Sequence, residues 1–390
     1  MLQGLRGLRL VLRASRMWYA LCLCLIVLLI GCGNQQSQQF FTLSRLHAPN
    51  LQWLAVPSRI PLKDGVHGGV LLGLATFQPA GSSVPQVAMN FLGTTIDHTE
   101  LHTIGLDGSH PHLINVEDGC GPFAIPVDGQ WIICADDGRL DQIARLSSNG
   151  VAAVHQVHLP GDNNTIFTWS PDGRYFAVVD SSEVSTCSIN VFSSQPPYTT
   201  FSKVATIASD MFNLLDRCDI NGLSWSANGK YLLIGTASVC CETASGEPTT
   251  NGEAFTAVST AFLSQAGNAA GAQPPTITIP RKQFAIASAE ALSLGWNLTI
   301  AWNLDNTTVV FASTADISNM QRDTLVSFDL HTHLLTTLLV MPDQAHHVQS
   351  MAWTPDGRHL LFAVGFFCRE DCPQRADALS DVYEFTPPAS

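Results

Sequence analysis

The sequence predicts an all-β fold that is assembled from repeated antiparallel units. A turn with the same frame recurs five times, with one apolar strand entering it and a second leaving it. Short apolar runs bounded by Gly, Pro, Asn and Asp fill the intervals between these turns, as strands do. After residue 32, no amphipathic pattern is long enough for a helix of about 12 residues. These three observations together indicate strands without helices.

The clearest copy of the turn lies in residues 167–179. Trp169 enters the turn, and an apolar, β-prone run leaves it. Pro171 presets φ at the second turn position, Asp172 can hydrogen-bond back to the local backbone, and Gly173 tolerates the positive φ that follows. The composition therefore predicts a type I turn between two strands, in which these four residues have structural roles.

Four more copies repeat this frame with varying fidelity. The turn positions 129, 173, 229, 306 and 357 are spaced by about 50 residues, with one longer interval. That interval contains a stretch rich in Gly, Ala, Ser and Thr, from Glu242 to Gln273, which we interpret as an insertion on one face of the fold. Besides the weak copy at 126–133, the residues that we assign to the turns are Trp225, Asn228 and Gly229, then Trp302, Asp305 and Asn306, and finally Trp353, Pro355, Asp356 and Gly357.

A repeat of roughly 40–50 residues, with four strands per unit and an aromatic residue before the turn, is typical of a β-propeller. A β-sandwich would not repeat one turn sequence, and a β-helix has a much shorter period. We predict six blades of four antiparallel strands, from five marked turns and one unmarked unit before residue 120. Seven blades are the alternative, if residues 40–85 form a full blade. Residues 381–385 would complete the last blade, with an N-terminal strand closing the ring.

The first 32 residues are expected to be a lipoprotein signal peptide that lies outside the fold. Four arginines precede an apolar run of 14 residues, Met17 to Ile30, which is shorter than the roughly 20 residues of a membrane-spanning helix. Residues 29–32 resemble the lipobox of bacterial lipoproteins, which implies lipid on the sulfur and on the new amino group of Cys32. An uncleaved anchor and an ordinary secretory signal are the alternatives, and each would also export the chain. We therefore expect a signal peptide at 1–32, a polar tether at 33–39 and a single propeller domain at 40–390.

Eight cysteines remain after residue 32, and an even number in an exported chain favours disulfides. Cys120 and Cys134 flank one turn and could staple it, whereas Cys368 and Cys372 could close a small loop. The other four cysteines have several possible pairings. No Cys-x-x-Cys pair and no nearby histidine set has zinc-site spacing, so we predict no metal.

Two copies of the turn carry a family resemblance. Trp-Ser-Pro-Asp-Gly-Arg-Tyr at 169–175 and Trp-Thr-Pro-Asp-Gly-Arg-His at 353–359 resemble the WD-like repeat of TolB-type propellers, which also occurs in prolyl oligopeptidases. The resemblance extends over roughly residues 86–388 and implies six blades, whose surfaces in TolB-type relatives bind protein partners at the envelope. The Gly-x-Ser-x-Gly nucleophile motif of the peptidase relatives is absent from the sequence, so the resemblance implies the fold and not the activity.

The charged and titratable residues do not indicate a chemical site. A net charge of −13 argues against nucleic acid as a partner. Among the thirteen histidines, His110 with His112 and His331 with His333 are expected on strands, and the pair at 346–347 is expected in a loop. The recurring turn aspartates have a structural role and lack the second acidic set that calcium would need. We predict no catalytic residue and no cofactor.

The sequence therefore favours a non-enzymatic protein that is held at the cell membrane, on its extracytoplasmic side, by acylated Cys32. Its function would be to bind a protein partner or to act as a scaffold at the cell envelope. The alternative is a propeller enzyme, a hydrolase, lyase or cyclase with its site at the mouth of the central channel, because such enzymes place scattered polar residues there.

Overall fold

The computed structural model describes most of the chain from Arg45 onward. The chain divides into two units, and the larger one is formed by Leu46–Cys368 with Ala378–Ser390. Arg45 is the one described residue of the other unit. The described residues are 45–63, 69–79, 81–92, 99–114, 123–126, 129–134, 141–147, 150–157, 166–183, 186–208, 220–226, 228–236, 253–261, 276–280, 300–302, 308–317, 320–332, 334–342, 346–366 and 380–387.

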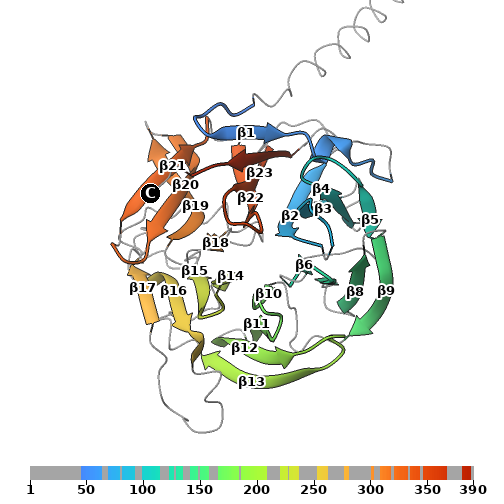
Figure 1. Ribbon diagram of the computed structural model, residues 1–390. Coiled ribbons are helices and arrows are strands. Elements are labelled where there is room, and N and C mark those ends of the chain that lie inside the picture. The colour runs from blue at the N-terminus through green and yellow to red at the C-terminus, as the bar shows by residue number, and fades with distance from the viewer. Residues whose placement is uncertain are drawn as a thin grey trace, which may run out of the picture. The chain divides into compact units, whose positions relative to one another are not determined.

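The larger unit consists of six four-stranded antiparallel sheets, which are the blades of a propeller (Figure 1). From the centre outwards, blade 1 contains β2 (Val70–Phe77), β3 (Gln86–Leu92), β4 (Thr99–Gly105) and β5 (His112–Ile114). Blade 2 contains β6 (Phe123–Ala124), β7 (Trp131–Cys134), β8 (Asp141–Ser147) and β9 (Gly150–Val157), and blade 3 contains β10 (Phe167–Trp169), β11 (Tyr175–Glu183), β12 (Thr186–Ser194) and β13 (Phe201–Ala208).

The remaining three blades repeat this arrangement. Blade 4 contains β14 (Ile220–Trp225), β15 (Tyr231–Thr236), β16 (Glu253–Ser259) and β17 (Thr276–Pro280), and blade 5 contains β18 (Ile300–Trp302), β19 (Thr308–Ile317), β20 (Met320–Asp329) and β21 (Leu335–Val340). Blade 6 contains β22 (His346–Trp353), β23 (Leu360–Phe366), β24 (Asp381–Phe385) and β1 (Leu51–Leu54). The predicted six blades are confirmed, and the seven-blade alternative is wrong because β1 and β2 belong to two different blades.

The N-terminal strand β1 closes the ring by pairing with β24, as the sequence predicted. The register places Leu51 opposite Phe385 and Leu54 opposite Val382. Trp53 Nε1 donates a hydrogen bond to Asp381 Oδ1 at 3.0 Å. Both ends of the described chain therefore meet in blade 6. Its three inner strands, β22, β23 and β24, come from the C-terminal part of the chain, and its outer strand, β1, comes from the N-terminal part.

The hydrophobic core lies in the seams between neighbouring blades. Each sheet has a neighbour on both sides, so its second strand carries mainly buried apolar side chains. One seam cluster joins Ala177 and Val179 of blade 3 to Leu232 and Ile234 of blade 4. All four side chains are at most 6% exposed. Burial of this kind stabilises by about 1.5–3 kcal/mol per large side chain, which makes the seams the main source of stability.

The connections between strands lie on two opposite faces of the propeller. Because the strands of each blade alternate in direction, the turns from first to second strand lie on the same face as those from third to fourth strand. The repeat turns at 170–173, 226–229 and 354–357 all join a first to a second strand, so they share this face. A short 3₁₀ helix, η1 (Pro57–Arg59), follows β1, and no helix in the described ranges has the length and apolar character that crossing a membrane requires.

Candidate functional site

The repeat turn at residues 170–173 is closed by backbone hydrogen bonds. The N–H of Gly173 donates to the carbonyl oxygen of Ser170 at 2.8 Å, and the N–H of Ser170 donates to the carbonyl oxygen of Tyr175, also at 2.8 Å. Gly173 has φ +68°, a left-handed conformation that glycine adopts without a steric penalty. The predicted turn is therefore confirmed, including the reason for its glycine.

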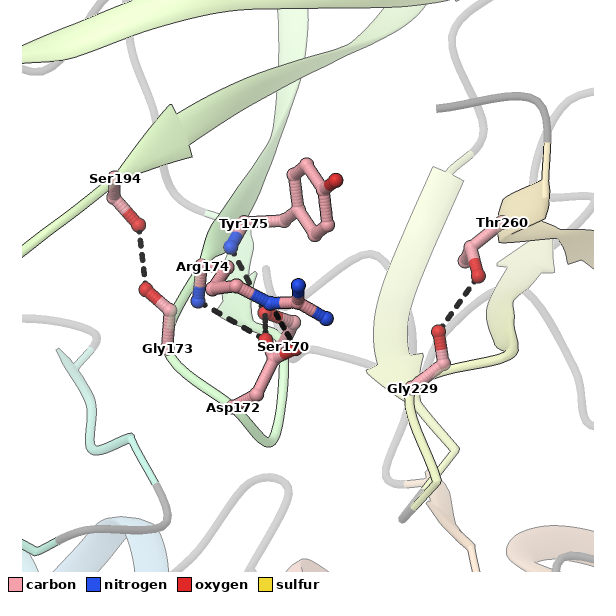
Figure 2. Close-up of polar contacts among 8 residues, drawn as sticks. All are labelled: Ser170, Asp172, Gly173, Arg174, Tyr175, Ser194, Gly229 and Thr260. Atoms are coloured by element: carbon pink, nitrogen blue, oxygen red, sulfur yellow. Dashed lines mark hydrogen bonds and ion pairs between the residues drawn. The ribbon is translucent and has the colours of Figure 1, made fainter. Parts of the chain in front are cut away.

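Asp172 is the centre of the side-chain contacts in this turn (Figure 2). Its Oδ1 accepts hydrogen bonds from the hydroxyl of Ser170 at 2.7 Å and from the backbone N–H of Arg174 at 3.0 Å, and its Oδ2 accepts from Arg174 Nε at 2.5 Å. Partial burial alone would raise the pKa of Asp172, but these hydrogen bonds and the charge of Arg174 outweigh it, so the pKa lies below its usual value. Both oxygens of the carboxylate therefore accept hydrogen bonds from residues of the turn itself.

The turn of blade 4 reproduces this arrangement with an amide in place of the carboxylate. Asn228 Oδ1 accepts from the hydroxyl of Ser226 at 3.0 Å and from the N–H of Lys230 at 2.9 Å. Gly229 has φ +67°. The acceptor oxygen, rather than the negative charge, is therefore what the turn requires.

The turn of blade 6 follows the same pattern. Asp356 Oδ1 accepts from the hydroxyl of Thr354 at 2.6 Å and from the N–H of Arg358 at 3.1 Å, and Gly357 has φ +66°. The hydrogen bond from Thr354 is the main reason why the pKa of Asp356 is lowered. Asp305 and Asn306 of blade 5 lie outside the described residues, as does Asp128 of blade 2.

Two hydroxyl groups that sequence reasoning missed complete the repeat turns. Ser194 Oγ donates to the carbonyl oxygen of Gly173 at 2.8 Å, and Thr260 Oγ1 donates to that of Gly229 at 2.6 Å (Figure 2). The first hydroxyl belongs to the last residue of β12, and the second follows the last residue of β16. The sequence signal is a Ser or Thr at the end of the third strand of a blade, about 20–30 residues after the turn glycine, which is visible once the strand order is known.

The tryptophans before the turns of blades 4 and 5 join each blade to the preceding one. Trp225 Nε1 donates to the carbonyl oxygen of Thr168 at 3.3 Å, and Trp302 Nε1 donates to that of Ser224 at 3.1 Å. Each indole also lies nearly parallel to the tyrosine that follows the preceding turn. The ring pairs are Tyr175 with Trp225, at 6.3 Å and 17°, and Tyr231 with Trp302, at 6.4 Å and 18°.

The seam that closes the ring uses different groups. The Thr76 hydroxyl donates to the carbonyl oxygen of Trp353, and the N–H of Leu74 donates to Ser350 Oγ at 3.0 Å. Blade 1 therefore lacks the tryptophan of the repeat but is still hydrogen-bonded to blade 6. This agrees with the absence of a marked turn in the first unit of the sequence.

The innermost strands border the centre of the propeller (Figure 1). Within their bounds, β2, β6, β10, β14, β18 and β22 contain apolar, small, hydroxyl and amide side chains together with two histidines, and no Asp, Glu, Lys or Arg. His346 is 3% exposed, and His347 Nδ1 lies 3.3 Å from Asp323 Oδ2 across the seam with blade 5. Apart from this pair of histidines, the side chains of the described inner strands do not titrate near neutral pH and carry no charge.

The histidine pairs lie differently from the sequence expectation. His346 and His347 begin strand β22 and not a loop. His110 lies in the loop before β5, with φ +51°, whereas His112 lies on that strand. His331 lies in a turn, and His333 lies outside the described residues. Within the described ranges, no group of three or more His, Cys, Asp or Glu side chains is arranged to hold a metal ion.

The cysteine predictions fall mostly outside the described part of the chain. Cys134, the last residue of β7, is 2% exposed and is disulfide-bonded. Cys120, Cys368 and Cys372 lie outside the described residues, as does Cys32, so the two proposed pairings and the lipidation site remain predictions.

Comparison with known proteins gives distant structural likenesses and no family. No family model matches the chain, and no curated protein matches it. Among solved structures, the β-propeller domain of Cps50 (Swd1) from Myceliophteria thermophila is 9% identical, with a TM-score of 0.46 over 82% of this chain and 84% of that one. TolB from Acinetobacter baumannii is 11% identical, with a TM-score of 0.46 over 78% of this chain and 66% of its own. With these sequence identities and TM-scores, neither structure indicates what this chain binds.

Proposed function

We propose that this chain is a lipid-anchored β-propeller on the extracytoplasmic side of the cell membrane, where it binds a protein partner of the envelope. The anchor is proposed from the sequence: a basic segment, a short apolar run and a lipobox-like end at Cys32. The binding role is proposed from the propeller, whose rigid blades can present loops and a central opening to a partner.

The observation that carries the binding role is the chemistry of the repeat residues and of the inner strands. The recurring polar residues of the turns are engaged by neighbouring backbone and hydroxyl groups. The described inner strands carry neutral side chains and two histidines. These features support recognition by shape and neutral hydrogen bonds more than acid–base chemistry at the axis.

The exposed surface of the described residues favours a partner that binds reversibly. Leu72 at 36% and Leu334 at 62% are the exposed large hydrophobic side chains in the described ranges. Obligate partners usually meet through larger apolar areas. We therefore expect a partly polar interface, whose affinity falls as salt is raised.

The anchor is tested by Cys32→Ala in the native host. The wild-type protein should sediment with membranes and incorporate labelled palmitate, whereas the variant should do neither. Cys24→Ala, in the apolar run before the lipobox, is the matched control and should retain both properties. A processed Cys32→Ala variant that still sediments with membranes and resists salt washing would refute the lipid anchor.

The binding role is tested by crosslinking in intact cells, followed by purification of the full chain and reconstitution with the recovered protein. A saturable complex of fixed stoichiometry between the two purified proteins supports the proposal. If no purified candidate binds the intact propeller, the scaffold role is refuted even where the anchor is correct. The same material allows the proposed disulfides, Cys120 with Cys134 and Cys368 with Cys372, to be mapped by digestion without reductant.

A further inference from the structure

Glu100 and His102 form a buried acid–imidazole pair inside blade 1. His102 Nε2 lies 3.0 Å from Glu100 Oε2, and the two side chains are only 4% and 9% exposed. They are two residues apart on β4, so strand alternation places both on the same side of the sheet. The ring of Phe91 meets the imidazole edge-on, with 6.0 Å between centroids. Neither the repeat turns nor the inner strands use this pair.

The second oxygen of Glu100 is bound by the segment that leads from β1 toward β2. We call this segment, residues 55–63, the strap. The backbone N–H of Lys63 donates to Glu100 Oε1 at 2.9 Å, and the guanidinium of Arg59 donates to the carbonyl oxygen of Asp107 at 3.1 Å. Glu100 lies near the start of β4 and Asp107 just after its end, so the strap is fixed at both ends of this strand.

Apolar side chains hold the middle of the strap. Val56, Ile60 and Leu62 are 3%, 0% and 5% exposed and belong to the cluster that fills the seam between blades 6 and 1. The strap therefore connects the closing strand β1 to blade 1, and Glu100 with His102 lie beneath its end. A change of charge at this pair therefore acts directly on the strap, which follows the strand that closes the ring.

Burial opposes a charge on His102. Burial lowers the pKa of the imidazole below its usual value of 6.5, the hydrogen bond and negative charge of Glu100 act in the opposite direction without outweighing it, and the positive charge of Lys63 lowers it further. On the strands beside β4, the residues opposite His102 are Met89 and Leu113, which do not titrate. A state in which the strap has lifted and His102 is hydrated regains the usual pKa. The closed state is therefore favoured above about pH 6.5 and loses stability as the pH falls.

We propose that the strap is an acid-sensitive latch on the closure of the propeller. When His102 takes up a proton, hydration of the charged pair requires the strap to lift from Glu100, while the blades stay folded. The proposal does not depend on lipid anchoring or on the identity of a partner.

The test is hydrogen exchange, followed by mass spectrometry, of the purified chain at pH 7.5 and pH 5.5, with rates corrected for intrinsic pH dependence. In the wild type, exchange in residues 55–63 should rise by up to about tenfold at pH 5.5, because one pH unit below the usual pKa corresponds to that factor. Peptides from β11 and β12 in blade 3 should be unchanged. A wild-type strap with equal corrected exchange at both pH values overturns the proposal.

His102→Gln supplies the decisive comparison, because its amide can still donate to Glu100 but does not titrate. Its strap should exchange equally at both pH values, whereas His331→Gln, at an exposed turn histidine, should behave like the wild type. An equal acid-induced rise in His102→Gln overturns the proposal. If that variant does not fold, Glu100→Gln replaces it: removal of the carboxylate should make the rise continue to lower pH than in the wild type. An unchanged pH profile in Glu100→Gln would also overturn the proposal.

Discussion

The indole N–H of Trp225 in blade 4 donates to the carbonyl oxygen of Thr168 in blade 3, across 3.3 Å. Trp302 makes the same contact with Ser224 one blade further on. These two tryptophans, which mark turns in the sequence, thus link consecutive blades, and each binds the residue directly before the tryptophan of the preceding blade.

Replacing Trp225 by Phe should weaken the seam between blades 3 and 4. The variant keeps a ring beside Tyr175 but leaves the Thr168 carbonyl without its indole donor, so we expect a loss of about 1–3 kcal/mol in the free energy of unfolding. Urea denaturation measures this loss. Leu334→Ala, at a 62% exposed position, is the control and should change stability by no more than about 0.5 kcal/mol. Equal effects in the two variants would contradict the seam role of the indole.

Gly173 and Gly229 form a matched pair for testing backbone strain against crowding. Both have positive φ, so alanine should cost about 1–2 kcal/mol at either position. A β-carbon at 173 would lie 2.5 Å from the Tyr198 hydroxyl, whereas at 229 the nearest atom is Pro171 Cδ at 4.0 Å. Gly173→Ala should therefore be the more destabilising by roughly 1–3 kcal/mol. Tyr198→Phe should rescue part of that excess in the double mutant, and purely additive effects would show that crowding is not its cause.

Asp172 should make stability depend on pH at the acid end. Its pKa is lowered in the folded protein, so its stabilising contribution is present above its usual pKa of 3.8 and is lost as the pH falls through the lower folded value. Asp172→Asn keeps the acceptor oxygen, as Asn228 does, and should show a shallower loss of stability between about pH 5 and pH 2. Asp172→Ala removes the acceptor and should cost about 1 kcal/mol at neutral pH. Thermal melts at several pH values compare the three proteins, and identical acid slopes for wild type and Asp172→Asn would contradict this assignment.

Tyr383 should control the attachment of the N-terminal segment. Its hydroxyl accepts a hydrogen bond from the N–H of Leu46 at 3.1 Å. Tyr383→Phe loses this bond, worth about 1 kcal/mol, so trypsin should cut after Arg45 roughly fivefold faster. Tyr231→Phe is the control, because the described structure gives its hydroxyl no hydrogen bond. Digestion at an unchanged rate after Arg45 in Tyr383→Phe would show that the contact does not limit opening.

Local chemistry explains why the repeat turns could be predicted from the sequence. Pro171, Asp172 and Gly173 act on backbone within a few residues of themselves, and the structure confirms the roles of Asp172 and Gly173. The blade number followed, because each marked turn opens one blade and the unmarked unit supplies one more.

Contacts between distant residues could not be predicted in the same way. The hydroxyl of Ser194 reaches Gly173 only because β11 and β12 pair in a particular register. Glu100 and His102 were visible as neighbours on one strand, but their burial depends on a strap that is about 40 residues away in sequence. The strand at His346 was predicted as a loop because its polar start lacks an apolar pattern, whereas Asp323 in blade 5 provides the partner that makes such a start stable.

The N-terminal strand β1 in blade 6 also sets an order of events during folding. Trp53 and Asp381 are 328 residues apart in sequence, so blade 6 cannot be completed until nearly the whole chain has been synthesised. Five blades can form from neighbouring strands, whereas the sixth must wait for the largest loop closure in the molecule. Until β1 has paired with it, β24 has an open edge, which can pair with another chain. A chain truncated before residue 381 would retain β1 without its partner strand, so truncation from the C-terminal end should produce aggregation rather than a smaller stable propeller.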